Sequence, residues 1–152
     1  MLTLINSSYF KDLLESFSYG VVIFNAKEQA YAVNTIATRM LGRSPQECVG
    51  ESPGSLFGSM DNLEAIQAML HACRQEGACP KPVDTVCLSP EGVKLHLSLA
   101  ASLLIENNKI FGILISMHDN THIYQLHERE KRIIEQNNRL QRERAESLLQ
   151  LS

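Results

Sequence analysis

The order of hydrophobic patterns along the chain predicts an α+β fold with a five-stranded antiparallel sheet flanked by short helices. Three observations support this prediction. An apolar stripe with helical spacing opens the chain, several short stretches then carry strand patterns, and residues 122–152 are rich in charge and contain no Gly or Pro. The sheet is therefore expected between an N-terminal helix and a long C-terminal helix.

The predicted N-terminal helix covers residues 1–17. Its apolar stripe has more hydrophobic surface than a monomer normally leaves exposed, which predicts that the helix pairs with a second chain. The stripe comprises Leu2, Ile5, Tyr9, Leu13 and Phe17.

Two short apolar runs follow, GVVIFN at residues 20–25 and AYAVN at residues 30–34. Both contain β-favouring residues, and the polar stretch between them suits a hairpin loop. Asn34 can accept hydrogen bonds from free backbone amides and so begin a short helix, which Gly42 can end in the left-handed conformation. The expected order is strand, hairpin, strand and short helix.

Two further helices are predicted before the chain returns to strands. Ser44, Pro45 and Glu47 form a compact set of start signals, with a capping box and a proline at the first helical residue. This helix has room for barely one turn. After a loop rich in Gly, Ser and Pro, the longest helix inside the domain is expected to start with Asp61 as its cap and to end at Gly77.

The second half of the chain changes to a period of two. PVDTVCL at residues 82–88 indicates a strand, and the last strand, IFGILISM at residues 110–117, follows an Asn-rich turn. Between them, residues 93–105 alternate strictly, as in an antiparallel strand with one buried face. The side chains predicted to share that face are Val93, Leu95, Leu97, Leu99, Ala101, Leu103 and Ile105.

The charged C-terminal helix carries a heptad pattern. Leu126, Ile133 and Leu140 recur every seven residues, and Asn137 occupies one of the complementary core positions. These four residues predict a coiled-coil seam, in which Asn137 would specify pairing at a cost in stability. The alternative is a solvated helix that frays at its end.

Residues 13–121 resemble a PAS sensory domain followed by its signalling helix. The resemblance rests on LLESFSYGVVIFNAKEQAYAVNTIATRMLGRSPQECVGESPGSLF, which is similar to the family's usual opening of strand, hairpin, Val-Asn, helix, Leu-Gly, Ser-Pro-x-Glu and Gly. The family also commonly ends its last strand with Asp-x-Thr before a coiled-coil linker, and Asp119-Asn120-Thr121 stands at that place. The apolar stripe predicts an N-terminal helix at 1–17. The resemblance implies a PAS domain at 18–121 and a signalling helix at 122–152.

Two departures from the family pattern concern the first hairpin. Asn25 stands where Asp is more usual, and Glu28 replaces the common turn Gly. They leave the tightness of that hairpin open.

The sequence HDNTH, residues 118–122, has two interpretations. Asp119 and Thr121 suit the free amides of a helix start, so the segment is expected to act as a joint that passes a change in the sheet to the C-terminal helix. A metal site would instead require His118 and His122 to converge with Asp119 or His127 across the junction. We expect the joint, and no metal.

The histidines suggest no cofactor site. PAS domains that bind haem take a ligand from the helix that contains His71, but His71 shares its polar face with Gln67 and Arg74. His96 is expected on the outward face of its strand, and His127-Glu128 resembles a kinase phosphoacceptor pair without the Pro expected downstream. The Asn-Cys-Arg-Phe-Leu-Gln segment of light-oxygen-voltage domains is absent, so haem and a flavin adduct are both unexpected.

Composition excludes several classes of function. The net charge of −3 gives no basic patch for nucleic acid, and the most apolar stretch is too short and interrupted to span a membrane. Cys48, Cys73, Cys79 and Cys87 contain no CxxC pair and are expected to be free thiols of a cytoplasmic protein. We find no catalytic motif, so any enzyme is expected beyond Ser152.

The sequence therefore predicts a sensory and dimerisation module of a larger, bacterial signalling protein such as a histidine kinase, a nucleotide cyclase or a transcription regulator. Homodimerisation is expected through both terminal helices, and a small molecule is a possible ligand of the PAS cavity. The alternative is a ligand-free PAS scaffold that only pairs chains.

Overall fold

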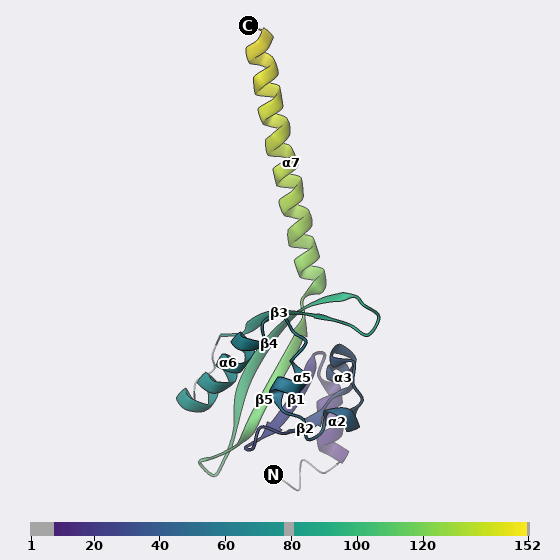
Figure 1. Ribbon diagram of the computed structural model, residues 1–152, viewed down its shortest axis with the longest axis vertical. Coiled ribbons are helices and arrows are strands. Elements are labelled where there is room, and N and C mark those ends of the chain that lie inside the picture. Colours follow the sequence, from purple (N-terminus) through teal and green to yellow (C-terminus); the bar gives the residue numbers. More distant parts are fainter. Residues whose placement is uncertain (1–7, 78–80, 152) are drawn as a thin grey trace. The chain divides into compact units, whose positions relative to one another are not determined.

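A computed structural model of the chain describes residues 8–77 and 81–151 (Figure 1). The chain divides into two compact units between Asn120 and Thr121. The elements of the first unit are α2 (Ser8–Ser16), β1 (Gly20–Asn25), β2 (Ala30–Val33), α3 (Thr35–Leu41), α4 (Pro45–Cys48), α5 (Pro53–Leu56), α6 (Leu63–Glu76), β3 (Val83–Leu88), β4 (Lys94–Glu106) and β5 (Lys109–Asp119). The second unit is the single helix α7 (Thr121–Leu151).

The five strands form one sheet in the order β2-β1-β5-β4-β3. All four neighbouring pairs are antiparallel, so the predicted α+β fold class is confirmed. The first and the last strands of the sequence lie side by side at the centre, where Val22 pairs with Ile115. The end of β5 therefore belongs to the middle of the sheet.

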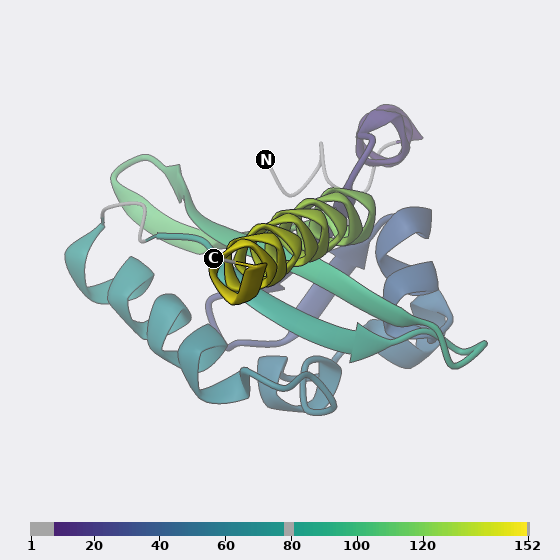
Figure 2. The ribbon, with the colours of Figure 1, turned by 90° about the horizontal axis from the view of Figure 1, so that it is seen from above.

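Both faces of the sheet are covered, as Figure 2 shows, with α2 on one side and α3 and α6 on the other. β1 alternates between two hydrophobic clusters. Val22 and Phe24 belong to the large cluster beneath α3 to α6, whereas Val21 and Ile23 pack with Leu14 of α2. Because it is covered on both faces, β1 is an uninterrupted apolar run.

Asn34 is a buried polar residue that holds three elements together. Its side-chain oxygen accepts hydrogen bonds from the backbone N–H groups of Ala37 and Val21, at 3.0 and 2.9 Å. Its amide nitrogen donates to the carbonyl oxygens of Leu14 and Tyr19. The predicted helix cap is confirmed, and the same side chain also ties α2 and β1 to α3.

Of the other predicted helix starts, one is confirmed and one is wrong. The capping box of Ser44 and Glu47 is present at α4. The prediction for Asp61 is wrong, because the cap residue of α6 is Asn62, which makes no side-chain cap bond. The short helix α5 was not predicted, although Ser52 and Pro53 begin it as Ser44 and Pro45 begin α4.

Asp61 instead anchors β3. Its carboxylate accepts hydrogen bonds from the backbone N–H of Val86 and the hydroxyl of Thr85, both at 2.8 Å. Its own N–H donates to the carbonyl oxygen of Val86. The hydrogen bond from Val86, followed by that from Thr85, holds the pKa of Asp61 below its ordinary value.

The alternation of β4 is confirmed in its middle and wrong at its ends. Leu97, Leu99 and Ala101 are at most 2% exposed. Val93 precedes the strand and is 55% exposed, and Ile105 follows a register shift and is 56% exposed. The predicted pattern holds only where α6 and the neighbouring strands cover the sheet.

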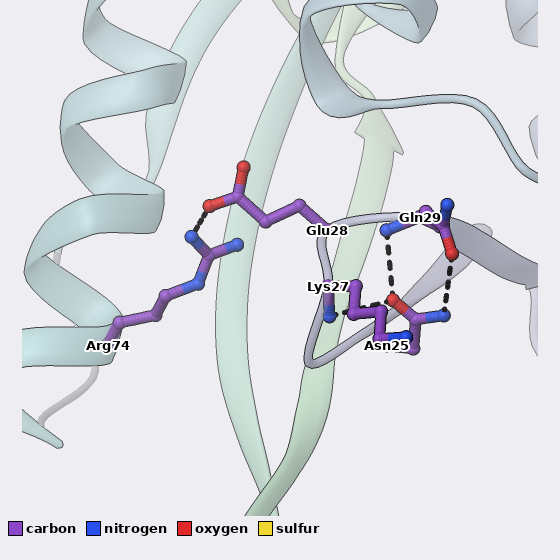
Figure 3. Close-up of polar contacts among 5 residues, drawn as sticks. All are labelled: Asn25, Lys27, Glu28, Gln29 and Arg74. Carbon is purple, nitrogen blue, oxygen red and sulfur yellow. Dashed lines mark hydrogen bonds and ion pairs between the residues drawn. The ribbon is translucent and has the colours of Figure 1, made fainter.

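The first hairpin is tight despite its departures from the family pattern (Figure 3). The side-chain oxygen of Asn25 accepts hydrogen bonds from the N–H groups of Lys27 and Gln29, at 2.9 and 3.0 Å. Glu28 adopts the left-handed conformation with φ of 63°, which costs a residue with a side chain about 1 kcal/mol. Its carboxylate forms an ion pair with Arg74 of α6.

Three cysteines, Cys48, Cys73 and Cys87, are buried free thiols, as predicted. Cys79, together with Leu2 and Ile5 of the predicted N-terminal stripe, lies outside the described residues. Within residues 8–77 and 81–151, no helix is both long enough and apolar enough to cross a membrane.

Candidate functional site

The first candidate site is the strand-to-helix joint, defined here as residues 118–121. β5 remains paired with β4 up to its last residue, because His118 lies opposite Ser98 and Asp119 lies opposite Leu97. Leu97 is 2% exposed and belongs to the main core. The end of β5 is thus hydrogen-bonded to β4, a strand whose side chains pack in the main core.

One residue separates the sheet from the long helix. The backbone N–H of Asn120 donates to the carbonyl oxygen of His96 at 2.7 Å, which extends the β4 pairing beyond the strand. α7 begins at the next residue, Thr121, one residue before the boundary predicted from the sequence. The two predicted joint residues, Asp119 and Thr121, are the last of β5 and the first of α7.

An aromatic stack lies beside the joint on the α2 side of the sheet. The ring of His118 lies 4.4 Å from that of Tyr19, and the ring of Tyr19 lies 5.2 Å from that of Phe17. The stack connects the chain that leaves α2 to the end of β5. Local sequence signals do not predict this contact, because about a hundred residues separate its two sides.

His118 is exposed and places its ring against that of Tyr19. In the part of the chain that the structure describes, no three His, Cys, Asp or Glu side chains gather closely enough to hold a metal ion. That the joint binds no metal remains a prediction.

The interior between the sheet and α3 to α6 is filled by side chains. Phe24 and Phe57 are fully buried there, and their rings meet edge to face at 6.1 Å. Soft, adaptable side chains surround them. This group contains four methionines and three cysteines: Met40, Met60, Met69, Met117, Cys48, Cys73 and Cys87.

Methionine side chains adapt to irregular spaces, so this part of the core is rich in adaptable side chains. The thiols are not suited to act as nucleophiles. Burial raises the pKa of both Cys48 and Cys87, which keeps these groups protonated at neutral pH.

His71 lies on the outer side of α6 and is exposed. It lines a surface groove of about 350 Å³ with Glu28, Gln67 and Arg74 among its neighbours. The polar face predicted for α6 is therefore confirmed. In this arrangement the imidazole does not point to the interior, where a haem would need its ligand.

The second candidate site is the apolar face of α7. Within the described chain, α7 has no buried residue. The seam residues Leu126, Ile133 and Leu140 are 44%, 50% and 47% exposed, and Asn137 is exposed among them. This face has the composition of a surface that pairs with another helix.

The family model of the PAS domain matches residues 18–122. The chain belongs to the PAS domain family. This match covers the sheet, the large hydrophobic cluster and the strand-to-helix joint, whereas Leu14 of the smaller cluster precedes it. The PAS domain therefore contains the first candidate site and α7 contains the second. No curated protein matches the sequence significantly.

Solved PAS domains share this fold at low sequence identity. The PAS domain of nitrogen regulation protein NR(II) from Vibrio parahaemolyticus is 18% identical, with a TM-score of 0.58 over 74% of this chain and 99% of that one. The PAS domain of an HTR-like protein from Haloarcula marismortui is 15% identical, with a TM-score of 0.57 over 78% and 94%. A PAS domain from a two-component sensor histidine kinase is 13% identical, with a TM-score of 0.55 over 73% and 93%.

Proposed function

We propose that this chain is the sensory and dimerisation module of a larger bacterial signal-transduction protein, such as a histidine kinase, a nucleotide cyclase or a transcription regulator. The observation that carries the proposal is the continuous path from the core through β5 to α7. A change in the packing of β4 and β5 would move Asp119, and only Asn120 separates that residue from the helix. The output is mechanical, a rotation or shift of paired helices.

The solved structures support the choice of signalling class. One of them comes from a two-component sensor histidine kinase, and another from a nitrogen regulation protein. A histidine kinase is accordingly the first candidate for the whole protein.

The proposed input is a small molecule bound in the interior beside Phe24 and Phe57. Methionine and cysteine side chains provide the adaptability for such a ligand, and exposed His71 argues against haem as its identity. The alternative is a PAS scaffold that binds nothing and only pairs chains. An absorption spectrum and a native mass spectrum of the purified protein distinguish the two, because a retained ligand adds mass or absorbance.

Dimerisation is proposed through both ends of the described chain. Tyr9 and Leu13 of α2 are 66% and 41% exposed, so this helix keeps apolar surface after packing on the sheet. Light scattering over a concentration series should show a dimer for the full chain. Removal of residues 1–10 should weaken that dimer more than removal of residues after His122, because the α7 seam contains polar residues. A full chain that stays monomeric at high micromolar concentration would refute the dimer.

The coupling itself is tested with two perturbations. Ile115→Ala loosens the buried part of β5, and a Gly-Gly insertion between Asn120 and Thr121 separates β5 from α7. We expect Ile115→Ala to change the dimer dissociation constant about fivefold or more, a typical allosteric coupling. In the insertion variant the same substitution should have little effect. Equal effects in both backgrounds would show that the joint transmits nothing.

A further inference from the structure

A groove on the surface of the first unit is separate from both candidate sites. It has a volume of about 570 Å³ and lies between α2, β2 and α4. Binding sites for small molecules commonly have this size, with an apolar lining and a few polar groups. The apolar side chains that line this groove are Phe10, Leu14, Ala32, Val33, Pro45 and Val49.

The groove differs in place from the interior that we propose as the input. Three of its lining residues, Leu14, Tyr31 and Ala32, pack in the smaller hydrophobic cluster on the α2 side of the sheet. Phe24 and Phe57 belong to the large cluster. A ligand of the groove would therefore contact α2 and the edge strand β2 without entering the main core.

Tyr31 contributes a polar group that the fold leaves unsatisfied. Its ring lies edge to face against that of Phe111, with the ring centroids 6.3 Å apart. Its hydroxyl oxygen is buried and has no hydrogen-bond partner among residues 8–77 and 81–151. A buried polar group without a partner costs free energy, so an acceptor that enters between α2 and β2 would stabilise the hydroxyl.

Lys11 gives the groove its charge. Of the described residues that line the groove, Lys11 is the one that is charged. It is exposed, and it forms no ion pair within the described part of the chain. Glu15 follows it by one turn of α2, but the Glu15 carboxylate accepts a hydrogen bond from the backbone N–H of Thr35 at 2.8 Å. The Lys11 ammonium group can thus pair with an anionic ligand.

We propose that this groove binds a small apolar carboxylic acid in its ionised form. The carboxylate pairs with the ammonium group of Lys11 and accepts a hydrogen bond from the hydroxyl of Tyr31. The hydrocarbon or aromatic part covers Val33, Pro45 and Val49. Since Val49 is 55% exposed, the ligand removes apolar surface from water when it binds.

Binding requires a small movement of α2, because the Tyr31 hydroxyl is closed off from solvent. α2 has nine residues, of which Leu14 is the buried one, so little packing opposes this movement. The bound ligand then connects α2 to β2 and α4. Because α2 is a proposed dimer contact, the ligand should also alter dimerisation. That consequence rests on the proposed function, whereas the binding site does not.

A titration of the full chain with octanoate tests the site. The backbone amide signals of Lys11, Gln46 and Val49 should shift saturably in two-dimensional NMR spectra, because these residues line the groove. Octanol should bind more weakly than octanoate, and octylamine more weakly still, because Lys11 attracts an anion and repels a cation. Equal affinity for octanoate and octylamine would overturn the assignment of a carboxylate.

Substitutions test the two polar contacts. Lys11→Gln should weaken octanoate binding about threefold, the effect of one exposed ion pair, and Lys11→Arg should retain it. Tyr31→Phe should weaken binding about tenfold without lowering the thermal stability of the unliganded protein, because it removes a hydroxyl that has no partner. Lower stability of Tyr31→Phe with unchanged affinity would show that Tyr31 is only structural. Lys27→Gln, at an exposed lysine outside the groove, is the matched control and should leave the affinity unchanged.

The place of the shifts separates this site from the proposed input. Shifts at Phe24 and Phe57, with none at Lys11 and Val49, would place octanoate in the interior; they would overturn the groove site and support the proposed input. Equal losses of affinity in Lys11→Gln and Lys27→Gln would show a non-specific attraction to positive charge and would reject the site. Absence of saturable shifts would also reject it, while leaving the dimer and the joint unaffected.

Discussion

β4 and α7 both carry apolar residues at a fixed period, but only β4 buries them within the chain. Leu97 and Leu99 of β4 are 2% and 0% exposed, whereas Leu126 and Ile133 of α7 are 44% and 50% exposed. The difference lies in what interrupts each pattern. The buried face of β4 has no polar residue from Leu95 to Leu103, while the α7 seam alternates its apolar layers with Glu130, Asn137 and Arg144.

Periodicity predicts which face of an element is apolar, and the polar residues that interrupt the pattern indicate how that face is covered. An unbroken face can be buried permanently in a core. A face with polar layers can be buried only where each polar group finds a partner. For α7, we propose that a second copy of the chain supplies those partners.

The largest effect is expected at Leu97. Leu97→Ala should lower the free energy of unfolding by about 2 to 5 kcal/mol, because it leaves a cavity against the core. His96→Ala, on the other face of the same strand, should cost under about 1 kcal/mol, since the variant keeps the backbone carbonyl that binds Asn120. Urea denaturation of both variants checks the strand register, and equal losses would contradict it.

Truncation of an apolar side chain in α7 should affect dimerisation and not the stability of the core. Ile133→Ala should leave the unfolding of residues 8–120 unchanged but raise the dimer dissociation constant about tenfold, because each dimer loses two seam side chains. Leu149→Ala, an exposed f residue of the same helix, is the matched control and should alter neither property. A change in core stability with Ile133→Ala would break the distinction between the two regions.

Much of the fold is predictable because its signals act over a few residues. Asn34 and the box of Ser44 and Glu47 bond to amides three residues away. Asn107 and Asn108 adopt the positive φ angles that a two-residue hairpin turn requires. Both partners of each such interaction lie within a few residues, so the local sequence is enough to predict it.

Asp61 was misread because its partners are distant in sequence. It has the side chain of a helix cap and precedes α6, yet its bonds go to Thr85 and Val86, 24 and 25 residues later. The local sequence does not show that distant residues compete with the helix start for the Asp61 carboxylate. The predicted burial of Val93 and Ile105 was wrong for a related reason, since alternation does not show where neighbouring elements stop covering β4.

The candidate sites divide in the same way. The place of the joint followed from Asp119 and Thr121, which are adjacent to a strong strand and a strong helix signal. The stack of Tyr19 on His118 needed the sheet order β2-β1-β5, which brings the first and last strands together. The seam residues follow from their spacing, but none of the described residues of α7 is buried within the chain.

A smaller effect, dependent on pH, is expected at Asp61. Its folded-state pKa is lowered, first by the hydrogen bond from Val86 and then by that from Thr85. The carboxylate therefore stabilises the fold above the unfolded-state pKa, and this contribution disappears as pH falls through the folded-state pKa.

Urea titrations of the parent and Asp61→Asn check this sign. Because Asp61 is exposed and water screens its interactions, the parent should be more stable by less than about 1 kcal/mol at pH 7. The two curves should converge in strong acid. A smaller loss of unfolding free energy for Asp61→Asn than for Leu97→Ala would show that the hydrogen bonds of Asp61 stabilise the fold less than the apolar face of β4 does. A constant difference from pH 7 to pH 2 would show that ionisation of Asp61 is not involved.

The smallest effect concerns Glu28, where two opposing contributions nearly cancel. Its left-handed backbone disfavours any side chain by about 1 kcal/mol relative to Gly, whereas its partly exposed ion pair with Arg74 stabilises by about 0.2 to 1 kcal/mol. Glu28→Gly should therefore leave stability within about 0.5 kcal/mol of the parent. Glu28→Ala keeps the strained backbone and loses the ion pair, so it should be the least stable of the three proteins.

Thermal unfolding at low and high salt separates the two contributions, because salt weakens the ion pair and leaves the backbone strain unchanged. If Glu28→Gly instead destabilises as strongly as Leu97→Ala, then the ion pair from the hairpin to α6 is as important to the core as its apolar face, and the contrast drawn between buried apolar patterns and exposed charged ones fails for the first unit.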